Sequence, residues 1–142
     1  MEVSQVNNRL RSAIEQAKAR AQSRRQTAAE AEKAYGLFLD TVATPLVRQV
    51  ANALKVAGIG FTVGTPGGGL RLTADRGRDD FIEFVLDSSA DVPLAAGRVC
   101  VSRGSRTIDQ TIPIKPGTAI EDLTDEDLLD FMIRALEPWL ER

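Results

Sequence analysis

The sequence contains no histidine, a single cysteine and few aromatic residues, and each shortage narrows the range of functions. Its 142 residues include no His, one Cys, and only 5% Phe, Trp and Tyr. Without histidine the chain lacks the commonest general base and metal ligand, which excludes Ser-His-Asp and Cys-His catalysis and the usual zinc sites within one chain. We therefore predict a protein that is not an enzyme and that holds no cofactor and no metal.

The sequence also lacks signals for a membrane or an oxidising compartment. Its one cysteine, Cys100, has no partner for an internal disulfide. No apolar run approaches the ~20 residues that span a bilayer, and the N-terminal residues carry Arg and Glu where a signal peptide has an apolar core. We expect a cytoplasmic protein with no membrane partner.

Charge is divided unevenly along the chain. Residues 1–57 hold nine Lys and Arg against five Asp and Glu, whereas residues 58–142 hold nine against fifteen. A basic N-terminal half on an acidic body indicates either a nucleic-acid-binding arm or subunits that attract each other head to tail. Both interpretations stay open.

A long helix is predicted for residues 1–43, which we call the arm and expect to be an oligomerisation element. Residues 2–34 contain no Gly or Pro and are rich in helix formers. Such a helix would be about 50 Å long, more than a domain of this size covers, and its thin apolar stripe usually needs a partner helix. The stripe recurs at steps of three and four, and it supplies the expected oligomer interface: Val3, Val6, Leu10, Ile14, Ala17 and Ala21. The alternative is that the arm folds back along its own sheet.

Residues 44–142 are predicted to form an α+β domain that begins with a second helix. Thr44 and Pro45 suit an N-cap and a first helical position, and Gly58 suits a C-cap. Because proline loosens a helix without always breaking it, the two helices are either separated at Thr44 or continuous with a kink.

An apolar alternation with a period of two then predicts an antiparallel β-meander of four to five strands. Tight loops at 66–69, 76–78 and 104–105 join the strands. These loops set Val63 opposite Leu72, Leu72 opposite Ile82, and Arg71 opposite Glu83, an ion pair across neighbouring strands.

A C-terminal helix, packed on the sheet, completes the predicted α+β fold. Thr124 suits its N-cap, and the three acidic residues that follow suit the positive end of the helix dipole. Its buried stripe is expected to comprise Leu128, Leu129, Met132, Leu136, Trp139 and Leu140.

Three surfaces are candidates for function. Phe81 and Val85 lie on the face opposite Ile82, Phe84 and Leu86, so this strand is apolar on both sides and its outer face is a possible partner surface. Asp79, Glu83 and Asp87 share that outer face and offer oxygen ligands, although they are about 7 Å apart and Arg71 competes for Glu83. A basic stretch of the arm offers phosphate contacts at Lys18, Arg20, Arg24 and Arg25.

These observations favour a small, cytoplasmic, non-enzymatic adaptor or chaperone-like interaction module. Its partners would be itself, most simply as a dimer, and a further protein. The alternative is a nucleic-acid-binding protein that uses the basic part of the arm, followed by a metal-dependent enzyme built on the acidic residues.

Overall fold

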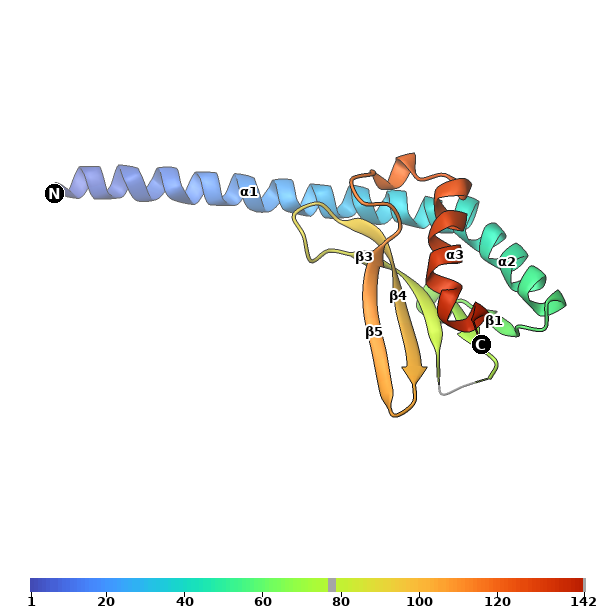
Figure 1. Cartoon of the computed structure of the whole chain (residues 1–142). Helices are drawn as coiled ribbons and strands as arrows, with labels where there is room; N and C mark the ends of the chain where they lie inside the picture. The colour runs from blue at the N-terminus through green and yellow to red at the C-terminus, as the bar shows by residue number, and fades with distance from the viewer. Residues whose placement is uncertain (77–78, 142) are drawn as a thin grey trace.

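The computed structural model describes residues 1–76 and 79–141 and has the predicted α+β fold, with a long helix that projects from a small body (Figure 1). The layout confirms the expected order of a long helix, a second helix, an antiparallel meander and a C-terminal helix on the sheet. The described elements are α1 (Val3–Phe38), η1 (Leu39–Ala43), α2 (Thr44–Val56), β1 (Phe61–Gly64), η2 (Pro66–Gly68), β2 (Leu70–Ala74), β3 (Phe81–Asp87), β4 (Leu94–Arg103), β5 (Arg106–Pro113), η3 (Ile120–Asp122) and α3 (Asp125–Leu140).

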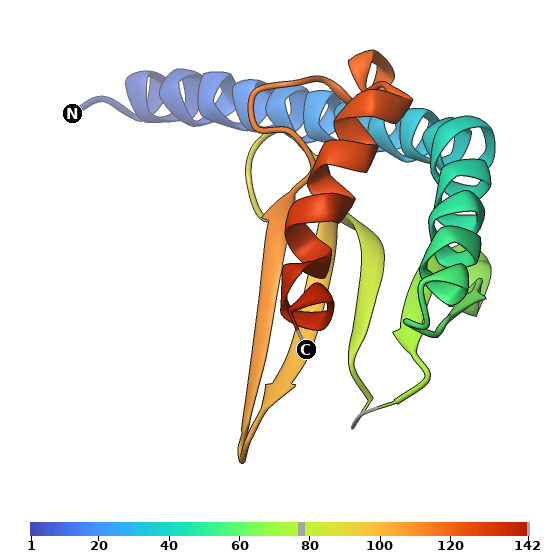
Figure 2. The ribbon, with the colours of Figure 1, turned by 45° about the vertical axis from the view of Figure 1, so that its right-hand side comes forward.

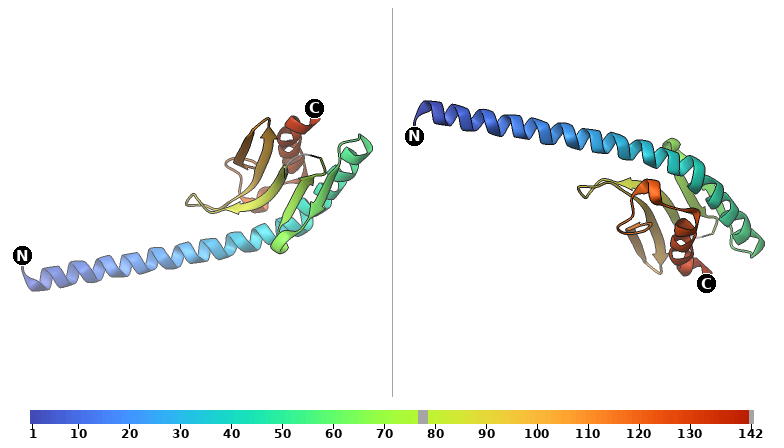
Figure 3. Two further views of the ribbon diagram at one scale, coloured as in Figure 1. Left: turned by 90° about the horizontal axis from the view of Figure 1, so that it is seen from below. Right: turned by 90° about the horizontal axis from the view of Figure 1, so that it is seen from above.

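The N-terminal helix does not stop at Thr44 but runs into α2 through η1, a π-helical turn. Thr44 has helical angles, φ −61° and ψ −48°, and its amide donates to the carbonyl of Leu39, five residues earlier. A proline inside an α-helix clashes with the carbonyl four residues back, and the wider turn relieves that clash at Pro45. The predicted Thr44 N-cap is therefore wrong, and the kinked continuous helix is confirmed (Figure 3).

Gly58 ends α2, as predicted. Its φ of +84° is left-handed, its amide donates to the Lys55 carbonyl at 3.0 Å, and the Ile59 amide donates to the Leu54 carbonyl at 2.8 Å. This pair of bonds is the Schellman motif, which satisfies carbonyls at the helix end. The chain then returns into β1, and α2 lies against β1 and β2 (Figure 2).

Within the described residues, β1 to β5 form one antiparallel sheet in sequential order. The predicted pairings of Val63 with Leu72, Leu72 with Ile82 and Arg71 with Glu83 are confirmed. Gly104 begins the two-residue loop between β4 and β5 with a φ of +62°, the left-handed value that a type II′ turn requires there. Residues 77 and 78 of the predicted 76–78 loop lie outside the described part of the chain.

The C-terminal helix α3 begins at the predicted cap. The Thr124 hydroxyl accepts from the Asp127 amide, and the Asp127 carboxylate accepts from the Thr124 amide, both at 3.1 Å, which makes a reciprocal capping box. The buried stripe comprises Leu128, Phe131, Met132, Ala135, Leu136 and Trp139. The predicted burial of Leu129 and Leu140 is wrong, since they are 38% and 44% exposed.

Aromatic contacts fix α3 on the sheet. The Phe131 ring lies edge-on to Phe84, with centroids 6.3 Å apart, and Trp139 lies edge-on to Phe61 at 5.5 Å. Gly97 of β4 lies directly under Phe131: a Cβ there would be 2.7 Å from Cε1 of the ring and nearer still to Cζ. Because Gly97 has no side chain, the Phe131 ring can pack directly against the β4 backbone.

Candidate interaction surfaces

The N-terminal part of α1 stands clear of the body and presents its apolar stripe to solvent (Figures 1 and 3). Every residue from 1 to 20 is exposed. Val3 is 76% exposed, Val6 39%, Leu10 56% and Ile14 52%. Ala17 is exposed and Ala21 is half-buried. The helix does not fold back along its own sheet, so nothing in the described chain covers these four large side chains.

The last turns of α1 hold the helix on the body. Phe38 is buried in the core, and Ala31, Ala34 and Tyr35 are partly buried against it. Burial, with a smaller contribution from the nearby Glu83 carboxylate, raises the pKa of the Tyr35 hydroxyl. Because α1 is one continuous helix from Val3 to Phe38, and its last turns are packed on the core, its exposed N-terminal part projects from the body in a fixed direction.

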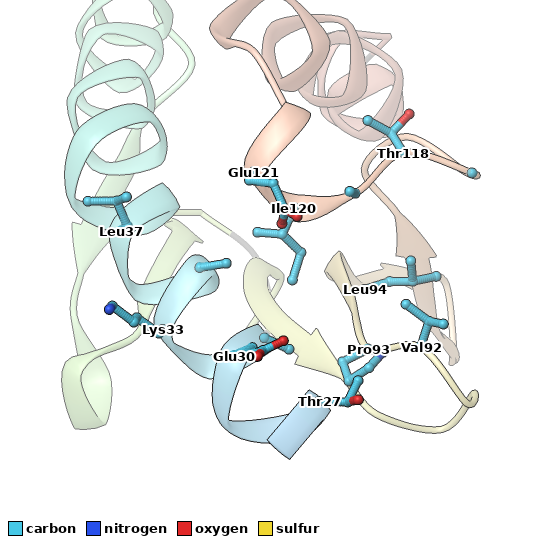
Figure 4. Close-up of a pocket in the computed structure, with 14 residues that line it drawn as sticks. Thr27, Glu30, Lys33, Leu37, Val92, Pro93, Leu94, Thr118, Ile120 and Glu121 are labelled. Atoms are coloured by element: carbon cyan, nitrogen blue, oxygen red, sulfur yellow. The ribbon is translucent and has the colours of Figure 1, made fainter. Parts of the chain in front are cut away.

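Two clefts lie along α1 where the helix meets the body. The first, of about 660 Å³, lies between the helix and segments 92–94 and 117–121. Figure 4 shows Leu37 on its helix side, with Val92, Leu94 and Ile120 on the opposite side. Its lining is mostly apolar, so it is suited to receive aliphatic side chains.

The second cleft, of about 620 Å³, lies nearer the N-terminus. Arg20, Arg24 and Ala28 line it from the helix, and residues 88–91 line it from the loop between β3 and β4. Thr27 and Pro93 line both clefts, so the two follow one another along the same helix. The sequence gives no signal for either, because each joins segments that are far apart in the chain.

The proposed partner surface at Phe81 and Val85 is half-buried. The Arg71 guanidinium carbon lies 4.3 Å from the centroid of the Phe81 ring, and that of Arg98 lies 5.4 Å away. Both distances suit cation–π interactions. The ring therefore lies among charged groups, and the outer face of the sheet is less apolar than the sequence suggests.

Carboxylates hold these two arginines in place. Arg71 is 2.9 Å from Glu83, and Arg98 is 2.7 Å from Asp109 across β4 and β5. The hydrogen bond from Arg98 lowers the pKa of Asp109, which favours the ionised carboxylate in this pair. The outer face of the sheet thus presents a network of paired charges around one aromatic ring.

The two acidic residues of β3, Glu83 and Asp87, interact with different partners and do not form a common site. Glu83 pairs with Arg71, and the Asp87 carboxylate accepts from the Ser89 amide at 3.0 Å. Across the described residues, no group of three or more His, Cys, Asp or Glu side chains is placed to hold a metal ion. Burial raises the pKa of the half-buried Cys100 thiol, which disfavours the nucleophilic thiolate.

The basic residues of the arm all face solvent. Lys18, Arg20, Arg24 and Arg25 are exposed, and Arg20 and Arg24 also line the second cleft. Because an α-helix turns by about 100° per residue, these four side chains point in different directions around the helix. In the part of the chain that the structure describes, no helix combines the length and apolar character needed to cross a bilayer.

Comparisons with protein-family models, with curated proteins and with solved structures find no match to this chain. Function is therefore inferred from the surfaces themselves: the exposed stripe, the two clefts beside it and the basic residues between them.

Proposed function

We propose that the chain is a small, cytoplasmic, non-enzymatic adaptor or chaperone-like interaction module that associates with itself through the arm, most simply as a dimer. The observation that carries this proposal is the exposure of Val3, Val6, Leu10 and Ile14 on a helix held away from the body. A helix that packs against nothing is only marginally stable in water, so a partner helix would also account for its length.

Burial of the stripe can offset the cost of association. Fully burying an aliphatic side chain of this size contributes about 1.5–3 kcal/mol, but these four are only 39–76% exposed in the single chain, so the eight in a dimer would contribute about 7–13 kcal/mol. Losing translational and rotational freedom costs about 4–15 kcal/mol. From Ile14 onward the stripe positions follow the alternating three- and four-residue steps of a coiled coil, with Arg24 at one of them. In the proposed module, the sheet face around Phe81 and Val85 would receive the further protein partner.

Light scattering tests the self-association directly. At micromolar concentration the protein is expected to elute with about twice the 15.4 kDa mass of one chain. Dilution should bring the mass down toward that of one chain, because an exposed two-helix interface without a shared core dissociates by mass action. A single-chain mass at high micromolar concentration would refute the proposal.

A second candidate function, nucleic-acid binding, is favoured by the exposure of Lys18, Arg20, Arg24 and Arg25. Four phosphate contacts on duplex DNA would give a log–log slope of affinity against salt of about −3.6, at about −0.9 per phosphate. The acidic body would repel the same polymer, so any binding should be weak and confined to the arm.

We therefore expect no gel retardation of duplex or single-stranded DNA at ~150 mM salt, where counterion release is reduced. Any binding at low salt should disappear when Lys18, Arg20, Arg24 and Arg25 are all replaced by Ala. Tight binding at physiological salt that is lost in this variant would instead make nucleic-acid binding the principal function.

A further inference from the structure

The apolar stripe of α1 changes in side-chain size along its length. Its N-terminal half carries Val3, Val6, Leu10 and Ile14, whereas the following positions at the same spacing are Ala17, Ala21, Ala28 and Ala31. Arg24 interrupts the alanines at a position that would face a partner helix. An interface between two copies has to match these large and small segments and accommodate this arginine.

We infer that two arms pair antiparallel, with the N-terminal half of each on the alanine half of the other. This inference rests on the proposed self-association and specifies its geometry. Val3 then lies opposite Ala28 of the second copy, Leu10 opposite Ala21, and Ile14 opposite Ala17. In these three layers a large side chain meets a small one, which is how packed helices interdigitate without voids. Val6 falls instead at the level of Arg25 of the second copy.

The position of Arg24 argues against the parallel alternative. In a parallel pair in register, Arg24 of one copy would face Arg24 of the other, and like charges in one layer repel. The alanines would also face alanines and bury little area. In the antiparallel pair Arg24 lies opposite Asn7, whose side-chain carbonyl can accept a hydrogen bond from the guanidinium.

The clefts beside α1 support the same direction. Antiparallel pairing brings residues 1–4 of the second copy to the level of residues 27–30, where the mostly apolar first cleft opens. It also brings Arg9 and Arg11 of the second copy to the level of the second cleft, where the Asp91 carboxylate attracts them and Arg20 and Arg24 repel them.

Cysteine cross-linking distinguishes the arrangements. In a Cys100→Ala background, Val3→Cys and Ala28→Cys chains are prepared separately and as an equal mixture, then treated with a short thiol-specific cross-linker. Antiparallel pairing predicts covalent dimers in the mixture and none in either variant alone. The two Val3 positions would be about 38 Å apart, given a rise of 1.5 Å per residue.

Light scattering on the same samples, before the cross-linker is added, tests self-association separately from the direction in which the two arms pair. Dimers that cross-link through Val3→Cys alone would establish a parallel pair and overturn this inference while leaving self-association intact. Dimers that give no cross-link in any sample would overturn it as well, by placing the interface elsewhere. A single-chain mass would refute the proposed function itself.

Discussion

Replacing Leu10 or Ile14 by Asp is expected to convert the dimer into a monomer whose body remains folded. Each side chain is more than half exposed in the single chain and would be buried in the helix pair. Burying an unpaired carboxylate costs several kcal/mol, and a cost of about 3 kcal/mol weakens a dissociation constant roughly 100-fold. Light scattering at a concentration where the wild-type protein is a dimer measures the loss.

The matched control is Ser12→Asp, which adds the same charge to the same segment. Ser12 lies between Leu10 and Ile14 in sequence but on the opposite side of the helix, since residues two apart are separated by about 200°. It should leave the dimer intact. The fluorescence of the buried Trp139 reports whether the body is folded in each variant. If the Leu10→Asp and Ile14→Asp variants both assembled like the wild-type protein, the association would use another surface.

Much of the fold follows from local sequence patterns. Alternation with a period of two and short loops rich in Gly are enough to set the sheet register, because a slip of one residue would turn every apolar side chain outward. Thr124 and the acidic turn after it likewise locate the start of α3. The helical spacing predicts the apolar stripe of the arm, because it depends only on neighbours three and four residues apart, whereas the exposure of the stripe in the single chain is seen only in the structure.

What the sequence did not predict depends on distant contacts. Thr44 and Pro45 are good local signals for a helix start, yet η1 widens the turn there and the helix continues. In α3 the apolar residues cover more than one face, and only the sheet determines that Phe131 turns inward and Leu129 outward. The clefts beside α1 depend on segments 88–94 and 117–121, whose positions no local pattern specifies.

Gly97 and Phe131 form the contact that orients α3, and substituting the glycine should have a large effect on stability. In an unobstructed strand, Ala would be more stable than Gly by about 0.5–1 kcal/mol, because glycine loses more entropy on folding. Here the new methyl group would overlap the Phe131 ring, which is only 2% exposed. Overpacking of this kind costs about 1–3 kcal/mol and should outweigh the entropic gain.

Gly97→Ala is therefore expected to lower the free energy of unfolding, and Phe131→Leu should rescue it in part because the smaller side chain removes the outer ring atoms. A double-mutant cycle should show a coupling of about 0.5–3 kcal/mol between these two residues. Urea unfolding followed by Trp139 fluorescence measures all four proteins. The cycle is best run in the Ile14→Asp background, since dimerisation would otherwise add a concentration-dependent contribution to stability. A Gly97→Ala variant as stable as its parent would mean that the Phe131 ring can move aside, and that the contact does not determine how α3 lies on the sheet.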